Sequence, residues 1–400
     1  MTQAEASTTT DESTSARTIA RELVAVLRRN AGAVDSQARF PEESMAAIRA
    51  SGLMGLLVPR AYGGMGLGLR ELVDAAEILG GGCVSTAFMW AMHCQQVDAI
   101  ARFGGAELRG DVLPAVARGE VYIASVTSQK GSGDLFSVAE AMVDLGDMVS
   151  FTRFAPVVTG GAYADGYLIT LRRSESAPNG DVRLVYAHRR QVDFAVRGEW
   201  NALGMRGTRS AGAEIRGSVA HHQIIETAGG MRRVAMESLI PTSHLAWAAC
   251  WLGTARTALA ETTAKLRRQG AAATGQEATL LRIARARLTL ELASSYVRTV
   301  CDYAADARSH GIPDGRLPDL QIHLNNVKVA AAEASYEVIN QLIHAAGVAT
   351  GYLQNSDIPL ERHLRDLRAA GLNQPDDRLM SANGHLAFLD RRVLRPGMAG

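Results

Sequence analysis

Several classes of protein are excluded by what this chain of 400 residues lacks. Its four cysteines include no Cys-x-x-Cys pair, so we expect buried reduced thiols and neither a disulfide framework nor a metal site. No apolar run reaches the roughly 20 residues that span a bilayer, and the polar N-terminus has no signal core. Forty-two basic side chains face forty-one acidic ones, which leaves no positive surplus for nucleic acid.

The remaining composition is that of a globular protein, which we expect in the cytoplasm. Hydrophobic residues make up 47% and charged residues 21%, and this length suffices for two or three domains with substantial cores. Residues 1–14 are the exception. Nearly all of them are Ser, Thr, Ala or acidic or amide residues, so we expect a disordered tail there.

The hydrophobic period changes twice along the chain. Residues 15–118 show helical spacing, as in the stripe that contains Leu23 and Leu27. Residues 119–228 carry short apolar runs, such as Val157-Val158, broken by Gly, Pro, Asn and Asp. Such runs are typical of strands. This part is expected to form a small β domain behind an N-terminal helical domain.

Long segments rich in Ala, Leu and Arg fill residues 229–400. Turn formers interrupt them near residues 270–275, 310–318 and 347–359. Four antiparallel helices fit this pattern. The whole chain is therefore predicted to be an α+β protein with an N-terminal helical domain, a middle β-barrel-like domain and a C-terminal four-helix bundle.

Three local motifs, in order along the chain, carry a resemblance to a known family. They are Gly52-Leu-Met-Gly-Leu-Leu-Val-Pro59 with Tyr62-Gly-Gly64, Trp200-Asn-Ala-Leu-Gly-Met-Arg-Gly-Thr208 with Ser210, and Pro359-Leu-Glu-Arg362 with Arg365-Asp366. On these motifs the chain resembles the acyl-CoA dehydrogenase superfamily from about residue 18 to residue 392. The resemblance implies the three-part fold, FAD between the β domain and the bundle, and a homodimer or homotetramer.

The resemblance also implies a set of flavin contacts. A family loop, Thr-Glu-Pro-x-x-Gly-Ser-Asp, is matched by Thr127-Ser-Gln-Lys-Gly-Ser-Gly-Asp134, and a Trp-Ile-Thr strand by Val157-Val158-Thr159. The arginine that a neighbouring subunit lends to the FAD pyrophosphate is matched by Arg267 or Arg268. The cofactor-binding residues that we expect are Thr127, Ser128, Ser132, Thr159, Arg268 and Gln341.

The catalytic carboxylate of the dehydrogenases is missing at both positions where the family places it. Removing the α-proton of an acyl thioester requires such a base. Counted from Arg365-Asp366, the usual Glu is Gln374, and the alternative position, on the first helix of the bundle, is Ser243, followed by His244. A carboxamide cannot accept the proton. Desaturation is therefore less strongly supported than the fold.

A second branch of the superfamily has no such Glu. It comprises flavin-dependent monooxygenases that resemble dibenzothiophene monooxygenase, and they use reduced flavin, for which FMN can replace FAD, together with O₂. Their end motif, Arg-Asn-x-Arg followed by His-Asn/Asp-Pro, is similar to Arg365-Asp-Leu-Arg368 and Asn373-Gln-Pro375. The resemblance implies that His93 lies near the flavin, where an imidazole could donate a hydrogen bond to oxygen. A hydrogen-bonded core histidine is the competing interpretation.

The candidate catalytic residues are therefore His93, Ser243, His244, Asn373 and Gln374. Neighbouring side chains on a helix point about 100° apart, so the Ser243–His244 pair is not a nucleophile–base arrangement.

Two further pairs have structural interpretations. His221 and His222 are predicted on a strand, where they would face opposite sides and could not share a metal. Trp247 and Trp251, four residues apart on a helix, are predicted to pack in the core or to line a substrate tunnel.

The sequence leaves three functions open. The first is an FAD-dependent oxidoreductase that acts on an acyl thioester of CoA or an acyl carrier protein, in specialised metabolism. The second is a flavin-dependent monooxygenase served by a flavin reductase. The third is a non-redox catalyst or binding scaffold on the same fold.

Overall fold

The computed structural model describes residues 3–129, 135–270, 274–311 and 317–389, with side chains from residue 15 onward. The N-terminal part of the chain is helical, as predicted. Its helices are α1 (Gln3–Ser36), α2 (Glu42–Ala50), α3 (Leu69–Gly80), α4 (Val84–Phe103) and α5 (Ala106–Ala117). Leu23 and Leu27 on α1 are buried, which confirms the predicted stripe.

Helix α1 differs from the prediction at its start, because it includes most of the segment 1–14 expected to be a disordered tail. Among the residues of α1 whose side chains are described, Ala16 is the first buried one. Once buried residues have fixed the first turns, adding further turns costs little, so a polar sequence can continue the helix.

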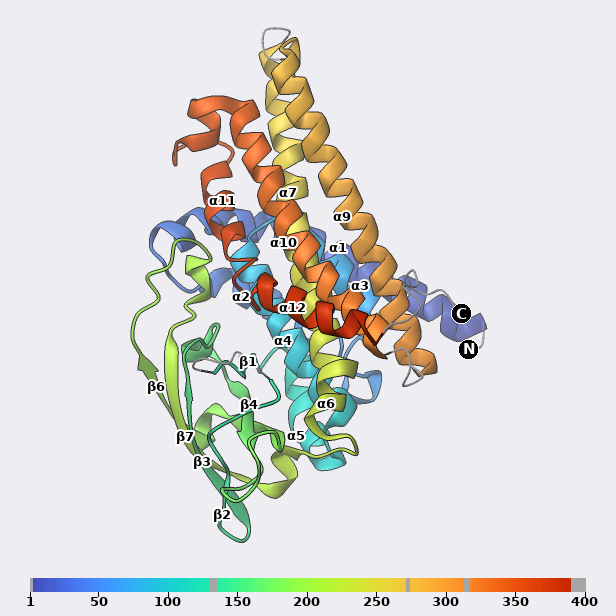
Figure 1. The fold of residues 1–400 in the computed structure, drawn as a ribbon, viewed down its shortest axis with the longest axis vertical. Coiled ribbons are helices and arrows are strands. Elements are labelled where there is room, and N and C mark those ends of the chain that lie inside the picture. The colour runs from blue at the N-terminus through green and yellow to red at the C-terminus, as the bar shows by residue number, and fades with distance from the viewer. Residues whose placement is uncertain (1–2, 130–134, 271–273, 312–316, 390–400) are drawn as a thin grey trace.

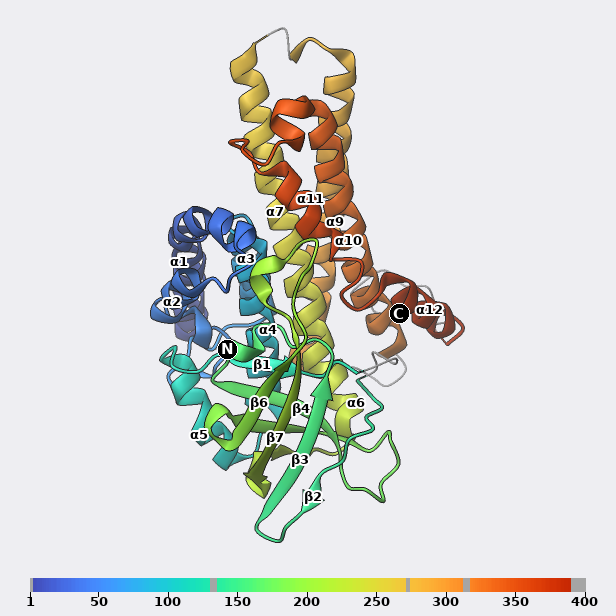
Figure 2. The ribbon, with the colours of Figure 1, turned by 90° about the vertical axis from the view of Figure 1, so that its left-hand side faces the viewer.

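The middle part of the chain forms two four-stranded sheets, which lie below the long helices in Figure 2. The first has the order β1-β4-β5-β8 and the second the order β2-β3-β7-β6. The strands are β1 (Ile123–Val126), β2 (Val143–Asp144), β3 (Met148–Ala155), β4 (Gly166–Arg172), β5 (Val182–His188), β6 (Val192–Arg197), β7 (Gly212–Ala220) and β8 (Ile224–Ile225). Strand β1 pairs with β4 in parallel, and the other pairs are antiparallel.

Two strand predictions are wrong in this part of the chain. Val157–Thr159 is a loop, since β3 ends at Ala155 and Gly160 turns the chain with a φ of 64°. His221 and His222 lie in a short 3₁₀ turn, His221–Gln223. In both places the apolar or β-prone residues flank a turn, and the turn decides the local conformation.

Three long helices rise from the sheets and form the core of the C-terminal part (Figure 1). They are α7 (Ile240–Gln269), α9 (Glu277–His310) and α10 (Leu317–Gly347), with α11 (Leu360–Arg368) as a short fourth member. The helix α6 (Gly230–Val234) and a π-helical turn, Ala235–Leu239, precede α7, and α12 (Asp376–Ala387) follows α11. The helix breaks predicted from the sequence agree with these bounds.

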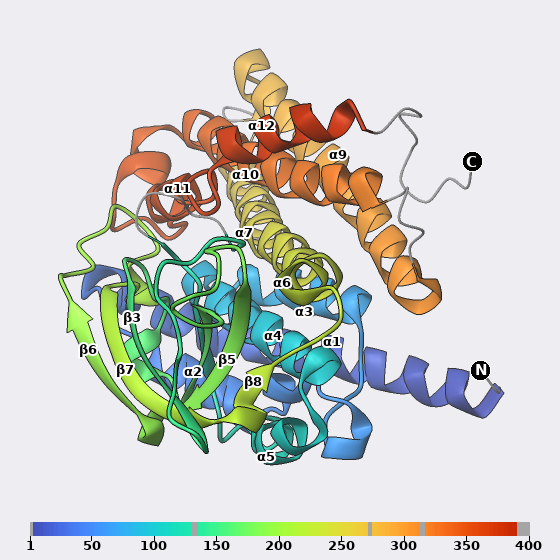
Figure 3. The ribbon, with the colours of Figure 1, turned by 60° about the horizontal axis from the view of Figure 1, so that its bottom comes forward.

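Close backbone contacts join the helical parts. A Cβ at Gly253 on α7 would collide with the carbonyl of Glu77 on α3. The second and third family motifs also meet, because Asp366 accepts the Met205 N–H at 2.6 Å and Arg365 donates to the carbonyl of Leu203 at 3.1 Å. Figure 3 shows the first sheet beside α4, which β1 contacts, and beside α6, which β5 contacts. Among the described residues, no helix is long and apolar enough to cross a membrane.

Candidate functional site

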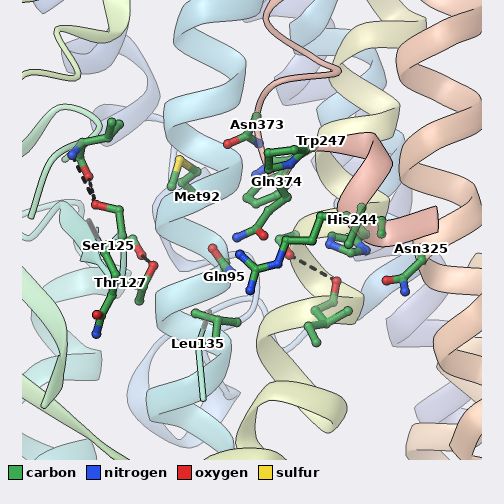
Figure 4. A pocket seen from close by; sticks show the side chains of 18 of the residues that line it. Met92, Gln95, Ser125, Thr127, Leu135, His244, Trp247, Asn325, Asn373 and Gln374 are labelled. Carbon is green, nitrogen blue, oxygen red and sulfur yellow. Dashed lines mark hydrogen bonds between the residues drawn. The ribbon is translucent and has the colours of Figure 1, made fainter. Parts of the chain in front are cut away.

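A cavity of about 1140 Å³ lies where the first sheet, α4 and the helical bundle meet. Seven of the predicted site residues line it, and Figure 4 labels four of them, Thr127, His244, Asn373 and Gln374. The predicted site residues in its wall are Thr127, Ser128, Thr159, Ser243, His244, Asn373 and Gln374. The fold therefore brings together residues that lie up to 247 positions apart, from both sides of the domain boundary.

Hydroxyl groups form the sheet side of the cavity. Thr127 follows β1, and its Oγ1 lies 3.1 Å from Oγ of Ser125. Oγ of Ser128 donates to the carbonyl of Val157 at 2.7 Å and accepts the Val157 N–H at 3.2 Å. These bonds hold the loop after β1 against the loop after β3. Thr159, which follows Val157, accepts a hydrogen bond from Ser210 at 3.1 Å.

Ser243 and His244 come from the first turns of α7, on the bundle side. Ser243 is 2% exposed, and its Oγ donates to the carbonyl of Leu239 at 2.6 Å. His244 is also buried, and its Nδ1–H donates to the carbonyl of Leu324 on α10 at 3.1 Å. Burial lowers the pKa of His244 to about 4. The ring is therefore neutral near pH 7, with Nε2 as an acceptor.

Asn373 and Gln374 lie in the turn between α11 and α12. Gln374 has a φ of 53°, a left-handed conformation that is costly for a residue with a side chain. Nζ of Lys328 on α10 donates to the carbonyl of Gln374 at 2.9 Å and to Asp376 at 2.6 Å. Lys328 is fully buried, and its Nζ lies 5.7 Å from the centre of the Trp251 ring. This lysine holds the turn in place.

Lys328 and Gln95 are residues that the sequence reasoning missed. Gln95 lines the cavity from α4, and its Nε2 donates to the carbonyl of Leu239 at 3.1 Å, where the π-helical turn leads into α7. One signal for Lys328 was available. It is one of only three lysines in the chain, and it lies in an otherwise apolar segment of α10.

Trp247 and Trp251 are both buried, as the core interpretation of this pair predicts, and both also line the cavity. Phe88 on α4 completes an aromatic wall. Its ring lies 5.4 Å from that of Trp247 and 6.2 Å from that of Trp251, with interplanar angles of 28° and 21°.

His93 is not among the described residues that line the cavity. It is fully buried, its Nε2–H donates to the carbonyl of Met54 at 3.2 Å, and its Nδ1 accepts the Ile123 N–H at 3.0 Å. Burial lowers the pKa of His93 to about 3. The two ring nitrogens thus join α4 to β1 and to the 3₁₀ turn Leu53–Gly55. This geometry corresponds to the competing core interpretation of His93.

The other expected cofactor contacts lie away from the cavity or outside the described residues. Arg268 is exposed near the end of α7. Gln341 lies far along α10, where its Nε2 donates to Glu337 at 2.6 Å. From these positions Arg268 and Gln341 could contact a flavin only in the cavity of a neighbouring subunit. Ser132 falls outside the described residues.

The cavity wall holds almost no negative charge. Among the described residues, Asp181 is the only lining residue with a carboxylate. Arg173 and Arg183 donate to it at 2.6 and 2.5 Å, and they lower its pKa. Glu237, which the sequence places near the start of α7, pairs with Arg233 at 2.8 Å. Both carboxylates are therefore paired with arginine.

Away from the cavity, His222 lies between two carboxylates of α5. Its Nδ1 is 3.3 Å from Glu107 and its Nε2 is 3.3 Å from Asp111. The two carboxylates thus face opposite edges of a half-buried imidazole ring.

Two family models match the chain. Residues 9–120 match the acyl-CoA dehydrogenase N-terminal domain, and residues 245–374 match the acyl-CoA dehydrogenase C-terminal domain. Together with the three-part fold, these matches place the chain in the acyl-CoA dehydrogenase superfamily, and the protein belongs to it.

Relatives from both branches of the superfamily cover most of the chain. The chain is 22% identical over 392 residues to a probable FMNH2-dependent monooxygenase, SfnC, of Pseudomonas putida, covering 94% of this chain and 95% of that one. It is 26% identical over 361 residues to a probable acyl-CoA dehydrogenase, fadE25, of Mycobacterium leprae, covering 88% and 90%. The structure of FMN-bound TdsC from Paenibacillus sp. A11-2 has the same fold, with a TM-score of 0.84, 21% identity and coverage of 96% and 99%.

Proposed function

We propose that this protein is a flavin-dependent oxidoreductase that transfers oxygen to a small organic substrate in the cavity between sheet and bundle. The observation that carries the proposal is the cavity wall itself. It has hydroxyl groups on the sheet side, aromatic rings on the bundle side, and Asp181, already paired with two arginines, as its sole carboxylate among the described residues.

The cavity fits a flavin nucleotide in size and in polarity. A volume of about 1140 Å³ exceeds that of ordinary single-ligand pockets, so cofactor and substrate can share it. Thr127, Ser128 and Thr159 supply hydroxyls for the polar edge of the ring, where donors stabilise the charge of the reduced form. Either FAD or FMN is compatible with these contacts.

The charge of the cavity wall fits the phosphate of such a nucleotide. Whereas Asp181 is the single carboxylate, five arginines line the cavity among the described residues: Arg183, Arg232, Arg365, Arg368 and Arg378. Arg365 is bound to Asp35 at 2.7 Å, while Arg368 stacks over Tyr336 with its Cζ 5.6 Å from the ring centre. Guanidinium groups are well suited to phosphate oxygens.

Oxygen transfer is favoured over desaturation because no described residue of the wall offers an unpaired carboxylate as a base for the α-proton. Gln374 and Ser243 occupy the two positions at which the resemblance expects a Glu, and neither side chain accepts a proton near pH 7. His244 is neutral, but a pKa of about 4 makes its Nε2 a weak base. A bound reduced flavin would supply the electrons and activate O₂ for the reaction.

The chain's own residues have simpler tasks in this proposal. Thr127 and Thr159 orient the ring, Phe88 and Trp247 exclude water around the substrate, and His244 accepts a hydrogen bond at Nε2. Gln374 is presented to the cavity by the Lys328 contact. The hydrogen-bonded surroundings of these groups keep them in place before the substrate binds.

Dehydrogenation of an acyl thioester, held by CoA or an acyl carrier protein, is the second candidate. The relative fadE25 supports it, since it covers 88% of this chain at 26% identity. In either case we propose a cytoplasmic enzyme of specialised metabolism that works as a homodimer or homotetramer. A flavin reductase would be the partner for oxygen transfer.

An assay with two arms separates the candidates. In the aerobic arm, protein, FMN, NADH and a flavin reductase are incubated with aromatic substrates under ¹⁸O₂, and products are analysed by mass spectrometry. In the anaerobic arm, FAD-loaded protein is mixed with a set of acyl-CoAs, and the flavin absorbance at 450 nm is followed. The proposal expects ¹⁸O in a product and no bleaching by acyl-CoA.

Bleaching without oxygen incorporation would contradict the oxygen-transfer proposal and support dehydrogenation. Protein that takes up neither flavin would favour the non-redox function on the same fold.

A further inference from the structure

The bundle wall of the cavity holds two buried N–H groups without an acceptor. Trp247 is 4% exposed, and its Nε1 has no hydrogen-bond partner. Nδ2 of Asn373 is buried and also unpartnered. Both residues line the cavity, on the side opposite Thr127 (Figure 4). Native proteins rarely leave buried donors unpaired, so two on the bundle wall of one cavity indicate a ligand that accepts from them.

The wall beside these donors is flat and apolar. The ring of Phe88 is inclined by only 28° to Trp247 and 21° to Trp251, and Met92 lines the same region from α4. Nζ of Lys328 approaches the Trp251 ring and helps to fix its orientation. Flat aromatic surfaces with a thioether beside them favour a planar unsaturated ligand over a flexible alkyl chain.

Two further polar side chains of the wall are neutral acceptors. His244 uses Nδ1–H for the Leu324 carbonyl and directs its ring toward Trp247, with ring centres 5.9 Å apart. Oε1 of Gln321, also in the wall, has no partner. These four groups are thus two donors and two acceptors, and none of them is a carboxylate. Such a set selects ligands by hydrogen bonds to uncharged groups.

We propose that the substrate is a planar aromatic molecule with a carbonyl-type oxygen, and that this oxygen accepts hydrogen bonds from Nε1 of Trp247 and Nδ2 of Asn373. The inference rests on the proposed function, because it names the substrate class for the same cavity. Trp247 and Asn373 act here as specificity-determining residues, and the aromatic wall supplies the stacking surface.

The test uses two probes of equal shape, 1-indanone and indane, which differ only in the carbonyl oxygen. Their dissociation constants are measured by ligand-observed NMR, with FMN-loaded protein and again without flavin. The wild-type protein is expected to bind 1-indanone about tenfold more tightly than indane, the size of effect that about one to two neutral hydrogen bonds give.

Three variants locate the preference. Trp247→Phe and Asn373→Leu remove one donor each. Each is expected to reduce the preference for 1-indanone over indane to about threefold or less. Trp251→Phe, the matched control, should weaken both probes alike and leave the ratio unchanged. Equal affinity of the wild-type protein for the two probes, no binding of either, or an unchanged ratio in Trp247→Phe would overturn the inference. Failure to load FMN would count against the proposed function alone, since the flavin-free arm still reports the ratio.

Discussion

At the scale of single residues, the buried His93 and His244 and the half-buried His363 contribute to the response of stability to acid. Burial lowers the pKa of His93 to about 3, of His244 to about 4 and of His363 to about 3. Each folded-state pKa lies below the ordinary value of 6.5. The stability that these neutral rings contribute is therefore present above pH 6.5 and is lost as the pH falls toward 4.

Replacing His93 tests its assignment as a structural residue. His93→Phe leaves the Ile123 N–H and the Met54 carbonyl buried without partners, so we expect it to cost about 2–4 kcal/mol of unfolding free energy. Urea titration at pH 7 measures this loss. The exposed His385→Phe should change the stability by less than about 0.5 kcal/mol. If His93→Phe kept its stability and lost turnover, a catalytic role would be indicated instead.

The pKa shift of Asp366 makes stability depend on pH in the opposite direction. Burial raises its pKa to about 6, although the Met205 N–H bond favours the ionised form. Because this folded-state pKa lies above the unfolded one, the associated stability is present below about pH 4 and is lost as the pH rises through about 6.

Asn at this position keeps the acceptor for Met205 and carries no charge. Asp366→Asn is therefore expected to raise the unfolding free energy at pH 8 by about 2–3 kcal/mol, and to have little effect at pH 4. Urea titrations at the two pH values test this, and a gain of equal size at both would show that the effect is not electrostatic.

At the scale of structural elements, the turn between α11 and α12 depends on one buried ion pair. Lys328 is fully buried, whereas the side chain of its partner Asp376 is 21% exposed. Burial lowers the pKa of Lys328, and Asp376 counteracts this shift. Removing Asp376 should therefore destabilise the protein more than removing Lys328, since water can reach the carboxylate but not the ammonium group.

We expect Asp376→Asn to cost about 3–5 kcal/mol at pH 7, because it leaves a buried ammonium group uncompensated. Lys328→Met should cost less, about 1–2 kcal/mol, since the remaining carboxylate can hydrate. The double variant should be more stable than Asp376→Asn alone. Urea titration of the three variants forms a double-mutant cycle. Equal losses in the two single variants would contradict the asymmetry.

The sequence predicts most of the helices and fails mainly at turns. The helix breaks of the bundle follow from Gly and Pro clusters, and the early stripe of α1 follows from helical periodicity. The loop Val157–Thr159 was predicted as a strand, because its apolar residues outweigh a single following glycine. The positive φ of Gln374 has no local signal, since Lys328, 46 positions earlier in the chain, maintains it.

The site was predictable where a family motif marks it and not elsewhere. Thr127, Thr159, Ser243 and Gln374 were located by motif and do face one cavity. The flavin contact expected for His93 rests on its position on a helix. That position does not indicate which carbonyl or N–H forms a hydrogen bond with its ring. The rarity of lysine marks Lys328 in the sequence, but its role follows only from the structure, because that role depends on contacts between α10 and the turn before α12.

At the scale of the whole molecule, one face of α9 is apolar and uncovered. Leu281, Leu288 and Leu292 lie on one helical face and are 53%, 58% and 64% exposed. An apolar helix stripe of this kind is typical of a subunit interface. It supports the proposed homo-oligomer.

Charge on that face should separate the subunits. We expect Leu288→Glu/Leu292→Glu to be monomeric by light scattering after size exclusion, while the wild-type protein is dimeric or larger. If Arg268 of a neighbouring subunit contacts the flavin, the monomer should also bind flavin more weakly. Replacement of the exposed Arg287, with Arg287→Glu, is the matched surface control. A wild-type monomer at micromolar concentration would contradict the proposed assembly.

The whole account depends on a flavin ring between the first sheet and the bundle, so direct titration of the protein with FMN and FAD tests it best. The quenching of flavin fluorescence should show one flavin per chain. Thr127→Val/Thr159→Val should bind it about tenfold more weakly, and the exposed Thr152→Val should bind it like the wild type. If the protein binds neither flavin, oxidised or reduced, or if the paired threonine variant binds as tightly as the wild type, the central claim is contradicted.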